Sequence, residues 1–161
     1  MICAGSPFAG GIRDPERSLV FANFNANKRG IVVDIDSEDG QRALKQLAAT
    51  ADILVETAAP GSMDQRGVGY TALREINPRL IYVSLTPFGL DGPHSGYKAL
   101  DLHIQAMGGM MTIQGDDERA PCMAPAQQGY QMASLHAAMG AMLAVIAREK
   151  TGRGQFVEVS M

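Results

Sequence analysis

Short apolar runs alternate with segments of helical periodicity along most of the chain. The runs at 31–35, 52–55, 80–85 and 155–160 are rich in β-branched and other apolar residues, and each is predicted to be a strand. Most of them are apolar almost throughout, which is typical of strands covered on both faces. Because helical segments separate them, we expect an α/β fold in which the strands form one mainly parallel sheet.

Helical periodicity is clearest at 38–50 and 127–149. Ser37 precedes the first of these segments as an N-cap, and acidic residues follow it in the first turn. In the second segment, large apolar residues fall on one stripe of the kind that normally faces a core: Met132, Leu135, Met139, Leu143 and Ile146. Shorter helices are expected at 70–76 and 100–110.

The chain is expected to form a single domain after an irregular beginning. Residues 4–17 are rich in Gly, Pro and Arg without a period, so we interpret 1–19 as a lead-in and 20–161 as the domain. A chain of 161 residues buries enough surface to fold without a disulfide or a metal.

Charge and composition exclude several classes of protein. A net charge of −3 argues against a nucleic-acid partner. The N-terminus lacks the basic flank and long apolar stretch of a signal peptide. The longest nearly apolar run, 137–147, is about half of a bilayer span, so no membrane partner is expected. The two cysteines, Cys3 and Cys122, form no C-x-x-C pair, which favours the cytoplasm over a secreted disulfide scaffold.

Common catalytic motifs are absent. The chain has neither a G-x-x-x-x-G-K-[ST] nor a G-x-G-x-x-G phosphate loop after a predicted strand. Its histidines lack metal-ligand spacing, so no metal site is expected. Ser84 and Ser134 lack the G-x-S-x-G elbow of serine hydrolases, and no nucleophile is evident from these patterns.

Five segments taken together are more specific than any single motif. In order they are Asn25-Ala26-Asn27-Lys28-Arg29, Ala51–Glu56 with Pro60-Gly61, Ile76–Ser84, Asp101 through Gln105–Met110, and Arg148–Gln155. In this order and spacing the chain resembles the family III CoA-transferases, the group of formyl-CoA transferase, carnitine CoA-transferase and α-methylacyl-CoA racemase. The resemblance covers residues 20–161.

The resemblance implies a fold and a reaction. The fold would be a partial copy of the family's Rossmann-like large domain, with helices on both faces of the sheet. In the reaction, a carboxylate attacks an acyl-CoA thioester to form a mixed anhydride, and CoA then passes to an acceptor acid. Acyl-CoA and a small carboxylic acid would be substrates, and no resident cofactor is implied. Family members form interlocked dimers, so a homodimer or a complementary subunit is expected.

The chain departs from the family at the position of the nucleophile. Family members carry an aspartate at the start of the helix that runs into Arg148–Gln155, and Tyr130 stands at that position here. No Asp or Glu occurs between Arg119 and Arg148. A phenol is a poor substitute for a carboxylate as nucleophile and leaving group. We therefore expect transfer by this chain alone to be impaired.

The resemblance also implies further site residues. Asp101 matches an acidic residue of the family's active-site region, and its place at a helix start suits it to orienting a substrate. Lys98 matches a lysine of the same region. CoA-binding positions fall at Val33, Thr57, Ser62 and Lys98, but polar or basic residues of the family are replaced at Asp36, Thr57-Ala58 and Gln65, which weakens the expected grip on CoA.

Three alternatives remain open at this stage. The leading interpretation is an acyl-CoA:carboxylate CoA-transferase-like protein, and the alternatives to it are a non-catalytic paralogue that binds acyl-CoA or a partner, one piece of a split enzyme, and an unrelated flavodoxin-like binding domain. A sheet with an uncovered apolar edge or face is expected to make isolated chains dimerise or aggregate.

Overall fold

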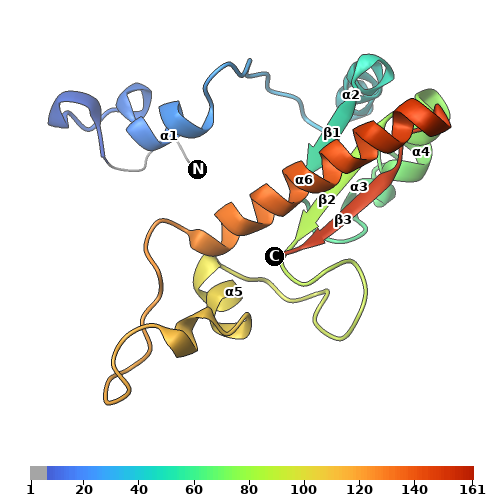
Figure 1. The fold of residues 1–161 in the computed structure, drawn as a ribbon. Coiled ribbons are helices and arrows are strands. Elements are labelled where there is room, and N and C mark those ends of the chain that lie inside the picture. Colours follow the sequence, from blue (N-terminus) through green and yellow to red (C-terminus); the bar gives the residue numbers. More distant parts are fainter. Residues whose placement is uncertain (1–6) are drawn as a thin grey trace. The chain divides into compact units, whose positions relative to one another are not determined.

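The computed structural model describes residues 7–161, which form two compact units, residues up to Val32 and residues from Val33 onwards (Figure 1). The first unit holds the 3-10 turns η2 (Ala9–Gly11) and η3 (Pro15–Arg17) and the short helix α1 (Leu19–Phe24). Ser18 begins α1 as its N-cap, where its hydroxyl accepts a hydrogen bond from the amide of Phe21. Cys3 lies outside the described residues.

The second unit is built on a parallel sheet of three strands, β1 (Ile53–Glu56), β2 (Ile81–Thr86) and β3 (Phe156–Ser160), in the order β1-β2-β3. The remaining elements are α2 (Glu38–Thr50), α3 (Ser62–Gln65), α4 (Tyr70–Ile76), α5 (Asp101–Met107), η4 (Met110–Ile113) and α6 (Gln128–Thr151). The prediction of an α/β fold with a mainly parallel sheet is confirmed.

The prediction of a strand at 31–35 is wrong. This run has no strand structure, and Ile31 and Val32 are exposed. A β-branched run becomes a strand only when a neighbour completes its ladder of hydrogen bonds, and no strand in residues 7–161 pairs with it. Local preference alone was therefore an insufficient guide at this position.

Helix α6 covers one face of the sheet (Figure 1). The side chains that it packs there are small. Its buried residues recur every three or four positions: Gly129, Ala133, Ala137, Ala141, Ala144 and Arg148. The four alanines pack on Ile81, Val83 and Leu85 of β2. The approach is close, since a Cβ on Gly140 would lie 2.8 Å from Cγ1 of Val157.

The stripe of large apolar residues in the same helix does not face this core. Leu143 is 67% exposed, and Met132, Leu135, Met139 and Ile146 are exposed as well. The prediction that they form the buried face is wrong, because the tight packing against β2 selects alanine rather than the most apolar side chains. By length and apolar composition α6 is able to span a membrane, although its alanine face packs on the sheet.

The opposite face of the sheet carries α2 and α4. Ala48 of α2 and Leu73 of α4 pack with Leu80 and Tyr82, so the side chains of β2 contribute alternately to two cores. The hydroxyl of Ser37 accepts from the amide of Gly40 and caps α2 as expected.

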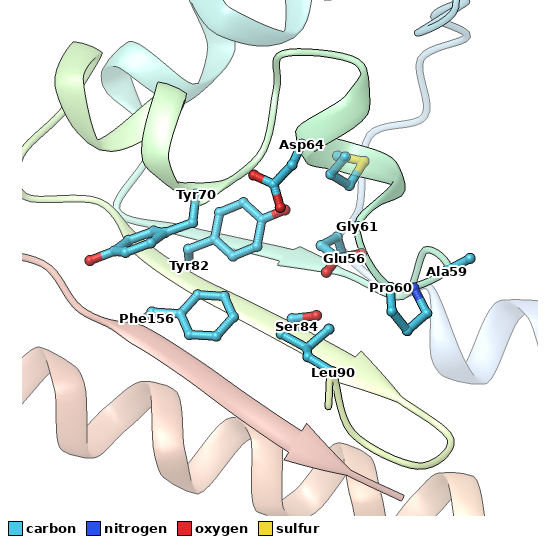
Figure 2. A pocket seen from close by; sticks show the side chains of 11 residues that line it. Glu56, Ala59, Pro60, Gly61, Asp64, Tyr70, Tyr82, Ser84, Leu90 and Phe156 are labelled. Carbon is cyan, nitrogen blue, oxygen red and sulfur yellow. The ribbon is translucent and has the colours of Figure 1, made fainter. Parts of the chain in front are cut away.

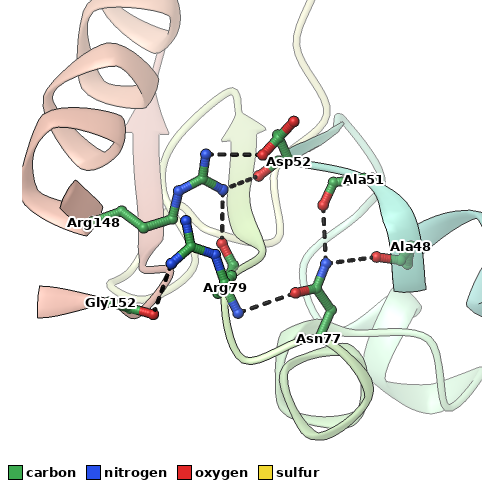
Figure 3. A network of polar contacts seen from close by, with 7 residues as sticks. All are labelled: Ala48, Ala51, Asp52, Asn77, Arg79, Arg148 and Gly152. Atoms are coloured by element: carbon green, nitrogen blue, oxygen red, sulfur yellow. Dashed lines mark hydrogen bonds and ion pairs between the residues drawn. The ribbon is translucent and has the colours of Figure 1, made fainter.

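A polar network fastens the amino ends of the strands to α6 (Figure 3). The buried Arg148 donates to the carboxylate of Asp52 at 2.9 Å and to the carbonyl oxygens of Asp52 and Arg79 at 3.3 and 3.0 Å. The side-chain amide of Asn77 donates to the carbonyl oxygens of Ala48 and Ala51. These side chains donate to carbonyl oxygens at the ends of strands and helices; those of Ala48 and Asp52 also accept a backbone N–H, and those of Ala51 and Arg79 have the side chain as their donor.

We predict that Arg148→Met destabilises the protein by about 2–3 kcal/mol, because it leaves two carbonyl groups and Asp52 without their charged donor. Urea denaturation measures the free energy of unfolding. Arg153→Met is the matched control, because it makes the same substitution at an exposed arginine. Equal stability of the two variants would contradict the role given to Arg148.

We also predict that Ala137→Leu destabilises by about 1–3 kcal/mol through overpacking against β2. By contrast, Leu143→Ala changes the free energy of unfolding by less than about 0.5 kcal/mol, because the side chain is exposed. The opposite ranking in a thermal or urea melt would place the large apolar stripe, rather than the alanine face, in the core.

Candidate functional site

The first turn of α6 meets the first turn of α5 at the centre of the candidate site. The backbone of Ala126 and Gln127 enters α6 in the left-handed region, with φ of 65° and 56°. Gln127, the N-cap residue, makes no side-chain cap hydrogen bond. The exposed amide groups of a helix start need acceptors, and here one comes from another element.

Asp101 is that acceptor. Its Oδ1 accepts from the backbone amide of Tyr130 at 2.9 Å, and its Oδ2 accepts from the side-chain amide of Gln105 at 2.5 Å. The residue is only 7% exposed, and a Cβ on Gly129 would lie 2.9 Å from Oδ1. A carboxylate at the N-terminus of a long helix is stabilised by the helix dipole. Asp101 therefore caps α6 from outside the helix.

Gln105 fixes the carboxylate in place. It lies one turn after Asp101 in α5, is 2% exposed, and exchanges two hydrogen bonds with the backbone of Ala124, at 2.8 and 3.2 Å. The loop before α6 is thereby tied to α5. Gln105 is not among the site residues predicted from the sequence, although its i, i+4 spacing from Asp101 is a usable signal.

The structure brings Asp101 and Tyr130 together, but through the backbone of Tyr130 and not through its phenol. Tyr130 is partly buried, and its carbonyl oxygen accepts from the hydroxyl of Ser134 at 2.7 Å. Both carboxylate oxygens of Asp101 are engaged in hydrogen bonds. The pair can hold and orient the start of α6, and the hydrogen bond on each oxygen of Asp101 makes its carboxylate a weaker nucleophile.

The other predicted positions do not join this cluster. Lys98 is exposed in the loop before α5, and Val33 is half-buried at the start of the second unit. Ser62 begins α3, where its hydroxyl is buried without a hydrogen-bond partner among the described residues. In residues 7–161, none of these three side chains has a hydrogen bond or ion pair with Asp101 or Tyr130.

Thr57 lies at the opening of a separate apolar groove with a volume of about 400 Å³. The groove runs between Ile53 and Val55 of β1 and the flank of α6, and Ser134 also lines it. Ser134 follows Tyr130 by one turn, so the groove and the Asp101 cluster share α6. Among the described residues, no group of three His, Cys, Asp or Glu side chains is arranged to hold a metal ion.

Comparison with known proteins identifies the family of this chain. CoA-transferase family III matches residues 6–161. The chain is 39% identical over 145 residues to the succinyl-CoA:(R)-benzylsuccinate CoA-transferase subunit BbsE of Thauera aromatica, covering 90% of this chain and 35% of that protein. It is 40% identical over 144 residues to the formyl-CoA:oxalate CoA-transferase of Streptomyces avermitilis, covering 89% of this chain and 35% of that protein.

Solved structures agree with the sequence relatives. A CAIB/BAIF family protein from Brucella suis superposes with a TM-score of 0.88 at 34% identity, covering 97% of this chain and 41% of that one. The chain thus spans about 35% of the length of the curated relatives it matches. The match extends over nearly all of the described residues, and the chain belongs to CoA-transferase family III.

Proposed function

We propose that this chain takes part in the transfer of CoA between carboxylic acids, as a component that binds and orients substrates and does not itself supply the nucleophile. The observation that carries the proposal is the Asp101 cluster. Its carboxylate sits at the start of α6, beside the position of the family's nucleophile, yet both of its oxygens accept hydrogen bonds. Tyr130 occupies the nucleophile's own position.

The chemistry of the reaction explains why this distinction matters. A nucleophilic carboxylate attacks the thioester carbonyl carbon, the carbon–sulfur bond breaks, and the CoA thiolate leaves as a mixed anhydride forms. The thiolate then attacks the carbonyl carbon contributed by the nucleophilic carboxylate, which releases the donor acid and leaves CoA as a thioester on the nucleophile. The acceptor acid attacks this thioester, which forms a second mixed anhydride and frees the thiolate. Attack of the thiolate on the acceptor's acyl carbon gives the new acyl-CoA and regenerates the nucleophilic carboxylate. Hydrogen bonds from two donors withdraw electron density from a carboxylate and lower its nucleophilicity, which raises the barrier to attack.

The substrates of the proposed reaction are an acyl-CoA and a small carboxylic acid, and its compartment is the cytoplasm. CoA is a substrate here rather than a resident cofactor. The nucleophile would come from a second polypeptide, a complementary subunit of different sequence. The relative from Thauera aromatica is named as a subunit, which supports an assembly of this kind.

A second candidate function is the binding of acyl-CoA without catalysis. The lack of any Asp or Glu between Arg119 and Arg148 favours it, because no carboxylate stands where the family carries its nucleophile. Both candidates require that the chain binds CoA, which calorimetry measures directly. A chain that has lost both functions would show no binding.

We predict that this chain by itself exchanges no CoA between a labelled carboxylate and a panel of short acyl-CoA donors. Tyr130→Asp is expected to gain weak exchange, because it restores a carboxylate at the family's position. Tyr130→Phe is the matched control and should stay inactive. Chromatography measures the transfer of the label from the free carboxylate into acyl-CoA.

Activity of the wild-type chain would reverse this assignment. If robust exchange persists in Tyr130→Phe and disappears in Asp101→Asn, Asp101 is the nucleophile and the capping role is secondary. Asn at this position can still accept a hydrogen bond from the amide of Tyr130, but its NH2 group replaces the oxygen that accepts from Gln105, so a thermal melt has to verify that this variant is folded.

A further inference from the structure

A second pocket lies on the face of the sheet opposite α6 (Figure 2). Its volume is about 160 Å³, enough for a small organic group. The residues that determine its chemistry are Glu56, Asp64, Tyr70, Tyr82, Ser84 and Phe156. None of them belongs to the Asp101 cluster.

The register of the sheet places a hydroxyl between two carboxylates. Ser84 of β2 is aligned with Glu56 of β1 on one side and with Glu158 of β3 on the other. Neighbouring strands lie about 4.8 Å apart, so these side chains form one row on the same face. Ser84 is 1% exposed, and its Oγ lines the pocket without a hydrogen-bond partner among the described residues.

The carboxylates around Ser84 retain acceptor capacity. Glu56 accepts from the amide of Ala58 at 2.6 Å through Oε2, and Glu158 accepts from the amide of Leu90 at 2.7 Å through Oε1. The carboxylate of Asp64 lies directly against the backbone of Gly69. A Cβ on Gly69 would lie 1.9 Å from Oδ1 of Asp64, so only glycine leaves room for it there. Its carboxylate takes no hydrogen bond within residues 7–161.

No cation of the described chain lines the pocket. Arg66 pairs with Asp36 at 2.6 Å, and the guanidinium of Arg74 lies 6.0 Å from the ring centre of Tyr70. A buried hydroxyl without a partner, beside two carboxylates without a cation, calls for a ligand that donates hydrogen bonds and carries positive charge.

Three aromatic rings form the wall of the pocket. Tyr82 stacks on Phe156 with centroids 5.7 Å apart, and Tyr70 lies 5.2 Å from Phe156 and 5.9 Å from Tyr82. Burial raises the pKa of Tyr82, and the charges of Glu56 and Asp64 raise it further, so its phenol stays neutral. Neutral ring faces attract cations and accommodate a short hydrocarbon chain.

We infer that this pocket binds the ammonium group of a small primary amine, whose three N–H groups donate to Glu56, Asp64 and the hydroxyl of Ser84. A metal ion is a poorer match, because in the part of the chain that is described no three acidic, His or Cys side chains form a metal-binding group. This inference goes beyond the proposed function, since none of these side chains is among the catalytic or CoA-binding positions assigned above.

The test is a titration of the full chain with n-butylammonium. NMR spectra report binding through the shifts of the ring proton signals of Tyr82 and Phe156. For a ligand of this size we expect saturable binding with a Kd on the order of 1 mM. Asp64→Asn and Ser84→Ala should each weaken binding about tenfold. Thr86→Val is the matched control, because Thr86 is also buried with an unpartnered hydroxyl in β2 but does not line the pocket.

Two probes test the ammonium assignment. Tetramethylammonium, which lacks N–H donors, and neutral 1-butanol should both bind more weakly than n-butylammonium. Equal binding of either probe, or unchanged binding in Asp64→Asn, would overturn the assignment. A pocket that holds only water would show no saturable shift, which also overturns it. Thermal melts verify the folding of each variant, and Ser84→Ala should melt at a higher temperature than the wild type without amine, because it removes the unpaired hydroxyl.

Discussion

The burial of β2 on both faces and along both edges is the constraint on which the second unit depends. All six of its residues are buried. Its edges are paired with β1 and β3, and its side chains alternate between the alanine face of α6 and the core formed with α2 and α4. A strand enclosed in this way tolerates few changes in the side chains that pack against it. It requires small side chains on α6 and fixes the register that aligns Glu56, Ser84 and Glu158.

Much of this architecture could be predicted from the pattern of residues. Alternating apolar runs and helical segments predicted the strands at β1, β2 and β3 and their parallel arrangement, because a strand followed by a helix returns in the same direction. The run at 31–35 could not be judged locally, since its state depends on a neighbouring strand. The buried face of α6 was also missed, because the distance between helix and sheet, and not the hydrophobicity of each side chain, decides which residues fit there.

The candidate sites show the same limit at the level of single residues. The resemblance to the family placed Asp101 and Tyr130 in one region, and the structure brings them into contact through a backbone amide. It gave no information on Gln105, whose role depends on a loop position 19 residues away in the chain. The pocket around Ser84 required the register of three strands, and no local motif contains that register.

The order of the strands along the chain has a consequence for how the protein assembles on the ribosome. β2 is followed by the whole stretch 87–155 before its second neighbour, β3, is synthesised. Until that strand emerges, one edge of the central strand stays open and α6 has only part of the surface on which it finally packs. Closing such a long loop is slow and entropically costly. During translation the nascent chain therefore exposes an aggregation-prone strand edge for the time needed to make nearly half of the protein, which is the period when a chaperone would be most useful.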